Sequence, residues 1–391
     1  MIFNTFAYFL LFLLPAAILF SMVKPSLQPW VCITFGAAFF LYFSITQVGG
    51  IPGACCILIF LWESCFSRLY KQGSLICLVG IAQSVLFLVI FKYWNFLTGL
   101  FFPSGHNPAI WAGAFLPLGI SFFTFEFIHY AVDRYRGKTL AGSFAQYLAF
   151  ILFFPTMVAG PIKRYQNFLP NIQNPDRSWP ANWQQGITRI MVGLVKKFAL
   201  ADFLTAVTVH LNSADIAAAP HRWLLIVWIL AYGGKIYFDF SGYSDIAIGS
   251  ARLFGIQVPE NFDWPYLRTN IAEFWGHWHM SLYRWLIDYI FIPLGGSRVA
   301  PPRVYLNVLI TMFLSGLWHG AGFNFIVWGL YHGVLLCAHR LWHQWRTPRT
   351  PTAVGNLAAG MLTFSLVTLG WAFFCLDLPT AGLFFKRLFI G

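Results

Sequence analysis

The sequence predicts an all-α protein that crosses a membrane several times. Of its 391 residues, 58% are hydrophobic and only 10% are charged. A soluble domain carries about 25% charged residues, so a soluble core has no room for this much apolar surface. Apolar runs recur along the chain at the length of about 20 residues that a membrane-spanning helix needs.

The net charge of +12 arises from 25 Lys and Arg against 13 Asp and Glu. A nucleic-acid-binding protein gathers its basic residues in a stripe or patch. Here they form small clusters between apolar runs, as in membrane proteins that keep Lys and Arg on the cytoplasmic side. The charge therefore indicates membrane topology and contact with anionic lipid headgroups, and it excludes nucleic acid as a partner.

The first half of the chain contains five predicted spans, over residues 2–23, 30–47, 51–66, 74–101 and 109–131. Basic residues follow alternate spans: Lys24, then Arg68 and Lys71, then Arg134, Arg136 and Lys138. The intervening loops carry neither Lys nor Arg, so the positive-inside rule places the N-terminus outside. Residues 2–23 lack a basic start and a small-residue cleavage site, which predicts a first spanning helix instead of a removable signal peptide.

Residues 144–160 form a short apolar run that Pro155 and Gly160 interrupt, with basic residues on both sides. This pattern predicts a re-entrant or interfacial segment, whose irregular backbone must be enclosed by protein or a water-filled cavity. Further apolar segments are predicted near 186–210, 222–240, 242–256, 270–293, 303–318, 322–341 and 355–376. The total is about 11 to 13 membrane-embedded segments. No repeat or linker divides them, so residues 1–391 are predicted to form one membrane domain.

The seven cysteines all lie in apolar stretches, and none forms a Cys-x-x-Cys pair. This pattern predicts buried structural thiols and argues against a disulfide framework or a zinc site.

Histidines inside apolar segments are the first candidates for chemistry, because an ionisable group in a membrane is costly. His319 lies in the run Ser-Gly-Leu-Trp-His-Gly-Ala-Gly, where glycines allow the backbone to bend and other groups to approach. A neutral imidazole there is suited to act as a general base on a hydroxyl. The alternative is a histidine that hydrogen-bonds two helices together.

His277 and His279 share the run EFWGHWHMSLYRW. On one helix, residues two apart point to different faces, so the pair cannot act side by side. His279 has the more apolar surroundings, with Tyr283 one turn further on, and His277 is predicted to be structural or at the surface. His279 lacks a partner at helical spacing, so no metal site is predicted.

Asp239 and Asp245 are the candidate carboxylates. Lys235 precedes Asp239 by four residues, and Arg252 follows Asp245 by seven. A buried structural ion pair and a catalytic role remain equal alternatives for them. Glu126 and His129, one turn apart, are predicted to be able to satisfy each other.

Three soluble-enzyme motifs are missing from the sequence: a complete phosphate loop, a Gly-x-Ser-x-Gly elbow and a dinucleotide-binding glycine run. This excludes a soluble-type hydrolase and a nucleotide site.

Longer runs resemble the membrane-bound O-acyltransferase family, and within it the bacterial branch that O-acetylates alginate and related polysaccharides. The matching runs are LPLGISFFTFEFIHYAVDRYRG (116–137), FFPTMVAGPIKRYQNF (153–168), YFDFSGYSDIAIG (237–249), PENFDWPYLRTNIAEFWGHWHMSLYRWLIDYIFIPLGGSR (259–298) and GLWHGAGFNFIVWGLYHG (316–333). They fill most of residues 90–335 in the family's order. Two departures stand out: Gly276-His277 replaces a basic pair that usually precedes Trp278, and Glu126 replaces a common glutamine.

The resemblance implies a ring of helices around a thin core, with a funnel from each membrane face. It implies catalytic roles for His319 and His279 and no metal. The supporting residues that we expect are Asp239, Asp245, Trp318, Tyr283, Ser281 and Asn261. The implied donor substrate is an acyl thioester, either acetyl-CoA or the phosphopantetheine of a carrier protein, with no permanently bound cofactor. The implied partners are membrane lipids, a cytoplasmic acyl carrier protein and a periplasmic esterase-like protein that passes the acyl group onward.

The expected function is transfer of an acetyl group from a cytoplasmic thioester across a bacterial inner membrane to a hydroxyl of a cell-surface polysaccharide. One alternative is D-alanyl transfer from a phosphopantetheine carrier protein to a teichoic-acid-type acceptor. The other is a transporter for a lipid-linked or acyl species, because transporters also contain buried polar residues and broken helices.

Overall fold

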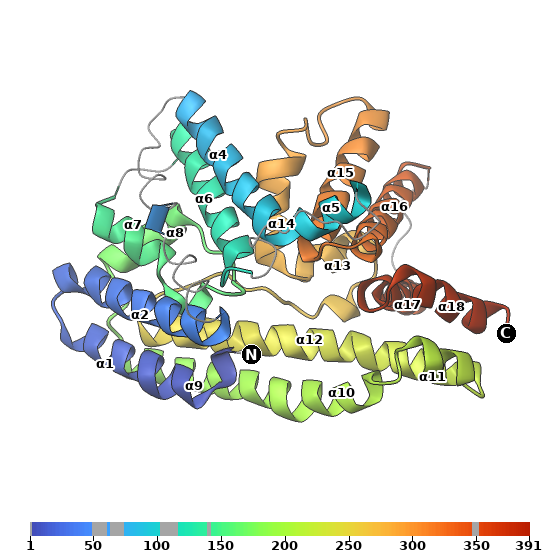
Figure 1. Ribbon diagram of the computed structural model, residues 1–391, viewed down its shortest axis with the longest axis horizontal. Helices are drawn as coiled ribbons and strands as arrows, with labels where there is room; N and C mark the ends of the chain where they lie inside the picture. Colours follow the sequence, from blue (N-terminus) through green and yellow to red (C-terminus); the bar gives the residue numbers. More distant parts are fainter. Residues whose placement is uncertain (1, 49–60, 63–73, 102–115, 139–141, 346–351) are drawn as a thin grey trace. The chain divides into compact units, whose positions relative to one another are not determined.

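The computed structural model describes residues 2–48, 61–62, 74–101, 116–138, 142–345 and 352–391. In these ranges the regular elements are helical, apart from one isolated bridge between Phe262 and Trp278. The all-α prediction is confirmed. The α-helices, drawn in Figure 1, are α1 (Leu14–Met22), α2 (Gln28–Val48), α4 (Ser74–Leu88), α5 (Trp94–Phe101), α6 (Ile120–Tyr135), α7 (Phe144–Ile151), α8 (Tyr165–Gln173), α9 (Trp179–Val195), α10 (Asp202–Thr208), α11 (Ser213–Ala218), α12 (Arg222–Leu253), α13 (Ile271–His277), α14 (Met280–Leu286), α15 (Pro301–His319), α16 (Phe323–Trp345), α17 (Ala353–Cys375) and α18 (Leu378–Phe389).

Four helical stretches of the described chain are long and apolar enough to cross a membrane: Pro25–Thr46, Leu75–Phe101, Arg222–Leu253 and Ala353–Cys375. Two shorter apolar helical stretches are Tyr8–Met22 and Phe144–Thr156. The protein is therefore a multi-pass membrane protein. The predicted span 51–66, with Cys55, Cys56 and Cys65, lies almost wholly outside the described residues. So do Arg68, Lys71 and the start of the span 109–131.

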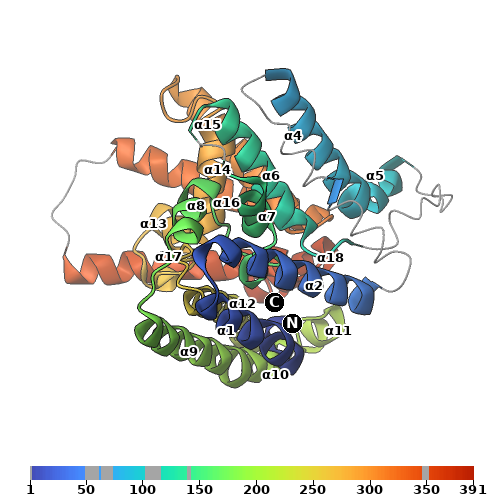
Figure 2. The ribbon, with the colours of Figure 1, turned by 90° about the vertical axis from the view of Figure 1, so that its left-hand side faces the viewer.

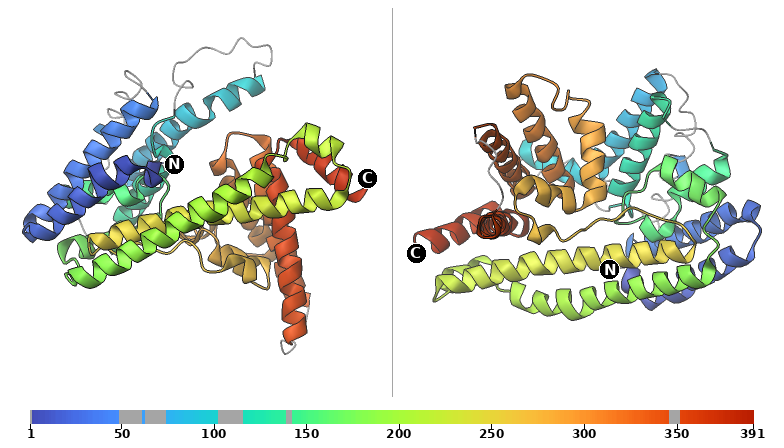
Figure 3. Two further views of the ribbon diagram at one scale, coloured as in Figure 1. Left: turned by 90° about the horizontal axis from the view of Figure 1, so that it is seen from below. Right: turned by 180° about the vertical axis from the view of Figure 1, so that it is seen from behind.

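The prediction of separate spans at 222–240 and 242–256 is wrong, because α12 is one helix of 32 residues (Figure 3). Polar and small residues lower the hydropathy near its middle without ending the helix. Gly249 allows α12 to pack closely against α9. A Cβ at this position would lie only 2.6 Å from the carbonyl oxygen of Gly186 on α9. The interruption in hydropathy near residue 241 therefore does not mark a turn.

The described chain divides into two compact units. Unit 1 comprises Met1–Leu194 and Tyr243–Pro259, and unit 2 comprises Val195–Gly242 and Glu260–Gly391. In unit 1, α4 and α6 lie side by side (Figure 2). Aromatic rings fill its core, where Phe39 packs on Phe43 and Phe154 with ring centroids 4.8 and 5.4 Å apart.

The short, broken course predicted for residues 144–160 is confirmed. A capping box between Ser143 and Gln146 starts α7, which ends at Ile151, and one 3-10 turn follows at Phe154–Thr156. The hydroxyl of Tyr243 donates to the carbonyl oxygen of Gly160 (2.8 Å) and accepts from the backbone N–H of Ala159 (3.2 Å). These bonds satisfy backbone groups that no helix satisfies here.

Glu126 and His129 do not satisfy each other, so that prediction is wrong. The Nζ atom of Lys163 lies 2.5 Å from Oε1 of Glu126, and the side chains are 2% and 4% exposed. The Nε2 atom of His129 accepts from the backbone N–H of Tyr165 (3.0 Å). Both partners come from the segment that follows the break at residue 160, which spacing within α6 cannot reveal.

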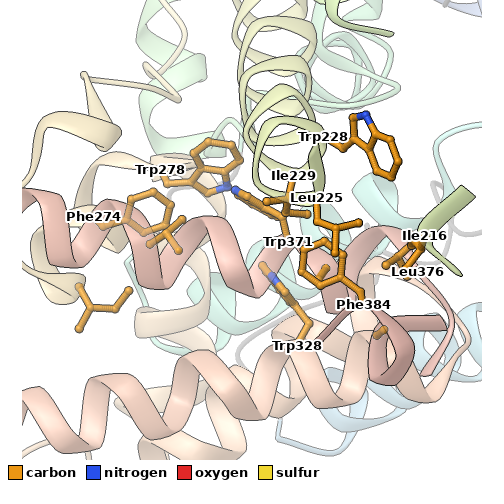
Figure 4. Close-up of a cluster of buried hydrophobic side chains, with 14 of the residues drawn as sticks. Ile216, Leu225, Trp228, Ile229, Phe274, Trp278, Trp328, Trp371, Leu376 and Phe384 are labelled. Atoms are coloured by element: carbon orange, nitrogen blue, oxygen red, sulfur yellow. The ribbon is translucent and has the colours of Figure 1, made fainter. Parts of the chain in front are cut away.

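Unit 2 contains a helical hairpin in which α15 and α16 run side by side (Figure 1). Glycines allow the close approach, since a Cβ on Gly316 would lie 3.0 Å from the Cα of Gly329. Indole rings fill the core beside the hairpin (Figure 4). The ring centroid of Trp371 lies 5.1 Å from that of Trp278 and 6.0 Å from that of Trp328. Such aromatic pairs each add about 0.5–1.5 kcal/mol beyond the area that they bury.

Cys32 and Cys77 are buried, Cys337 and Cys375 are half-buried, and all four are free thiols. This agrees with the prediction of structural thiols for the part of the chain that is described.

Candidate active site

His279 lies at a break between two short helices. The prediction that it shares a helix with His277 is wrong, because α13 ends at His277, Trp278 is extended and α14 begins at Met280. His279 itself has a left-handed backbone with φ of 47°. Few residues other than glycine adopt this conformation, and its cost of about 1–3 kcal/mol is met only where the surroundings impose it.

The backbone on both sides fixes this conformation. The N–H of Met280 donates to the carbonyl oxygen of Asn261 (2.9 Å), and the N–H of Asp263 donates to that of His277 (3.1 Å). These bonds join residues 261–263 to residues 277–280, which are distant in sequence. Residues 261–263 therefore hold in place the backbone that positions the imidazole of His279.

The side chain of Asn261 sets the tautomer of His279. Its Oδ1 atom lies 3.3 Å from Nδ1 of His279 and accepts from the backbone N–H (3.3 Å) and hydroxyl (2.7 Å) of Ser281. Because this oxygen accepts, Nδ1 of His279 carries the proton and Nε2 carries a lone pair. Nε2 is buried and has no hydrogen-bond partner among the described residues.

A cavity of about 490 Å³ opens beside His279, lined by residues of α13, α14, α15, α16 and the π-helix Ile287–Phe291. Its polar lining residues are His279, Tyr283, Thr311, Ser315, His339, Arg340, His343 and Gln344, and the other lining residues are apolar. No carboxylate lines it. A volume of this size suits a small-molecule ligand that is held by apolar walls and a few polar groups.

His319 ends α15 and is not among the residues that line this cavity. The indole of Trp318 packs against both candidate histidines, with its ring centroid 6.1 Å from that of His279 and 4.7 Å from that of His319. His319 also packs on Trp328 and Phe374, at 5.1 and 5.0 Å. The two imidazoles thus contact the same indole, within one compact unit.

The predicted partners of the two carboxylates are wrong. Asp239 pairs with Lys197 at 2.8 Å, and Asp245 pairs with Arg189 at 2.5 Å. Lys235 donates instead to Oγ1 of Thr208 at 3.4 Å, and Arg252 pairs with Asp176 at 3.7 Å. In each case the cation comes from a neighbouring helix, at a site that spacing along α12 does not show.

Of these carboxylates, Asp239 belongs to the compact unit that holds both histidines, whereas Asp245 belongs to the other unit. Ser281 and Asn261 contact each other at His279, Tyr283 lines the cavity, and Trp318 packs against both imidazoles. His277 is engaged elsewhere: its Nδ1 lies 2.7 Å from the carbonyl oxygen of Glu273, and its Nε2 lies 3.6 Å from Asp263.

Sequence reasoning missed several site residues. His339, Arg340 and His343 line the cavity, and their helical spacing was visible as His-Arg-x-x-His near the end of an apolar run. Sequence reasoning also missed His332, which is fully buried, lies 5.1 Å from the rings of both Trp275 and Trp328, and has no hydrogen-bond partner on either ring nitrogen among the described residues. No comparable signal pointed to His332.

Within the described ranges, no group of three or more His, Cys, Asp or Glu side chains is placed to hold a metal ion.

Comparisons with known proteins bear on this site. The family model for the membrane-bound O-acyltransferase family matches residues 35–377. The chain is 39% identical over 302 residues to the probable alginate O-acetylase AlgI of Pseudomonas aeruginosa, covering 76% of this chain and 56% of that protein. It is 34% identical over 340 residues to the peptidoglycan O-acetyltransferase of Helicobacter pylori, covering 78% and 62%. It is 30% identical over 292 residues to the teichoic acid D-alanyltransferase of Bacillus subtilis, covering 70% of each.

The chain thus spans less than two thirds of the length of the first two of these relatives.

Proposed function

The chain belongs to the membrane-bound O-acyltransferase family. From this premise we propose that it transfers an acyl group from a thioester donor to a hydroxyl, with acetyl as the first candidate for that group. The observation that carries the proposal is the buried lone pair of His279 at a mostly apolar cavity of about 490 Å³. Apolar walls exclude water, which would otherwise compete with the acceptor hydroxyl for the thioester.

The two histidines take different parts in the proposed reaction. His319 accepts the proton of the acceptor hydroxyl while the hydroxyl oxygen attacks the thioester carbonyl carbon. The carbon–sulfur bond then breaks, and the proton passes to the leaving sulfur, so that the donor departs as a free thiol. A general base of this kind contributes about 10²–10⁴ in rate.

His279 orients the donor. Its Nε2 atom accepts hydrogen bonds, because Nδ1 holds the proton toward Asn261. An acceptor nitrogen suits an amide N–H of a pantetheine arm lying in the cavity. It does not suit stabilisation of a developing negative charge, so we assign His279 an orienting role.

The proposed membrane is the bacterial inner membrane, with the N-terminus outside and the donor entering from the cytoplasm. Arg298 and Arg303 lie at the start of α15, and Arg340 lies near the end of α16. The antiparallel hairpin brings these residues to one end, as the hydrogen bond from Tyr305 Oη to Gln344 Oε1 (3.0 Å) shows. The positive-inside rule supports a cytoplasmic position for this end.

The proposed acceptor is a hydroxyl of a cell-surface polysaccharide, reached directly or through a periplasmic esterase-like partner. Support comes from the relatives named for O-acetylation of alginate and peptidoglycan. D-alanyl transfer from a carrier protein is the second candidate, because the teichoic acid D-alanyltransferase matches 70% of each chain. A donor that binds through its phosphopantetheine arm is compatible with both acetyl transfer and D-alanyl transfer.

Purified protein in proteoliposomes, supplied with acetyl-CoA labelled in the acetyl group, tests the proposal. With the donor added outside the vesicles, we expect the label to become covalently attached to a hydroxyl acceptor enclosed in the lumen. Movement of intact donor into the lumen, with no covalent label, would instead identify a transporter. Labelled D-alanyl carrier protein, tested in parallel, separates the two transferase candidates.

A further inference from the structure

We propose that His339, Arg340 and His343 form a binding site for the phosphate that joins the pantetheine arm of the acyl donor to the rest of the donor. This inference rests on the proposed function, because it assigns the anionic part of that donor. The three side chains lie on α16 and line the same cavity as His279.

The first observation is the charge of this part of the cavity. Arg340 is a permanent cation, and the imidazole rings of His339 and His343 lie with their centroids 4.4 Å apart. Among the described residues that line the cavity none is a carboxylate, and Glu273, whose charge acts on His339, lies outside the lining. A guanidinium beside two imidazole donors is the chemistry that recognises phosphate oxygens.

The second observation is that buried donor atoms here have no hydrogen-bond partner. Nε of Arg340 and Nε2 of His339 are buried and unpaired among the described residues. A buried donor without a partner costs about 1–3 kcal/mol, and more when it is charged. Such atoms are satisfied by a ligand, and a phosphate oxygen accepts from both.

The third observation is the distance along the hairpin. Sγ of Cys337 contacts the carbonyl oxygen of Tyr305 at 3.7 Å, so the basic residues lie near the level of Tyr305. Ser315 lines the cavity one turn before Trp318, which packs on His279. Tyr305 and Ser315 are ten residues apart on α15, which is about 15 Å along the helix axis. An extended pantetheine arm is of this order of length, so the phosphate lies at one end when the thioester lies at His279.

His277 does not compete for this role. His277 contacts Glu273 and Asp263 and is not among the residues that line the cavity. Gly276 has no side chain that could bind a phosphate, and a Cβ at this position would meet no atom within 4 Å. The phosphate-binding groups of this chain are therefore assigned to α16.

The test compares two donors that differ only in this phosphate. S-acetyl-4′-phosphopantetheine carries it, whereas S-acetylpantetheine lacks it. The variant is Arg340→Gln, and the matched control is Arg303→Gln, at an exposed arginine of the same hairpin outside the cavity. We expect Arg340→Gln to raise the KM for S-acetyl-4′-phosphopantetheine roughly tenfold or more, because a charged hydrogen bond is lost. The KM for S-acetylpantetheine and both kcat values should match those of the control.

A KM that rises equally for both donors, or for neither, would overturn the proposal. An effect that appears only in vesicles containing anionic lipid would also overturn it, because it would assign the site to a lipid headgroup.

Binding of labelled CoA, measured by equilibrium dialysis, separates this inference from the proposed function. If the wild-type protein transfers no acetyl group but binds CoA in a way that Arg340→Gln weakens, the function fails and the phosphate site stands. If the protein transfers acetyl and Arg340→Gln behaves like Arg303→Gln in both assays, the function stands and the phosphate site fails.

Discussion

Removing the ammonium of Lys163 should destabilise the protein strongly. Lys163 and Glu126 are 2% and 4% exposed, and their charged atoms lie 2.5 Å apart. Oε2 of Glu126 has no hydrogen-bond partner among the described residues. Lys163→Met therefore leaves a buried carboxylate whose only described partner has gone. Breaking a buried pair from one side costs about 3–5 kcal/mol.

The double variant Lys163→Met/Glu126→Leu should be much less damaging. Replacing a whole buried ion pair by apolar residues of similar volume is often close to neutral, because the cost of burying the charges disappears as well. Part of the loss will remain, since Nζ of Lys163 also lies 4.5 Å from the ring centroid of Phe150. We therefore expect the double variant to be more stable than the single one.

Reversible unfolding in mixed detergent micelles measures these free energies. Lys24→Met, at an exposed lysine, is the control and should stay within about 0.5 kcal/mol of the wild type. The reasoning is refuted if Lys163→Met is as stable as the control, or if the double variant is no more stable than Lys163→Met.

Three further predictions concern the site and its supporting helices. Glycine at position 279 should give a protein about 1 kcal/mol more stable than alanine there, because φ is 47° and both variants lose the same ring; equal unfolding free energies would contradict this. Asn261→Leu should lower kcat roughly tenfold while the protein stays folded, because Nδ1 of His279 loses its acceptor; an unchanged kcat would show that the tautomer is set in another way. Asp377 caps α18 by accepting from the N–H of Thr380 (2.9 Å), and hydrogen bonds from the Thr380 hydroxyl and then from this N–H hold the pKa of Asp377 below its usual value. A lowered pKa stabilises the folded state above the ordinary pKa of about 4, and this contribution is lost as the pH falls through the lowered value. The protection factors of the α18 amides should therefore fall at low pH in the wild type and show no such step in Asp377→Ala.

Much of the fold could be predicted from hydropathy alone. The runs near 303–318, 322–341 and 355–376 correspond to α15, α16 and α17 because uninterrupted apolar stretches have few alternatives to a helix in a membrane. The prediction failed where small and polar residues lie inside a helix, as in α12. There, Gly249 serves packing against α9, and hydropathy does not distinguish a packing glycine from a turn.

The site was predictable only in part. His279, Asn261 and Ser281 were chosen as residue types from the resemblance, and the structure joins them by hydrogen bonds. Partners that lie far apart in sequence were missed, such as Lys197 for Asp239 and Lys163 for Glu126. Spacing along one helix reveals neighbours on that helix alone, whereas buried charges here are paired across helices.

The most direct measurement of the central claim is the kcat of acetyl transfer, at saturating donor, for His319→Ala. Folded, correctly inserted variant protein should transfer acetyl about 10²–10⁴ times more slowly than the wild type. His277→Ala, at a histidine whose two ring nitrogens lie near Glu273 and Asp263, should transfer at the wild-type rate. Transfer by His319→Ala at the wild-type rate would contradict the proposal that this imidazole accepts the hydroxyl proton.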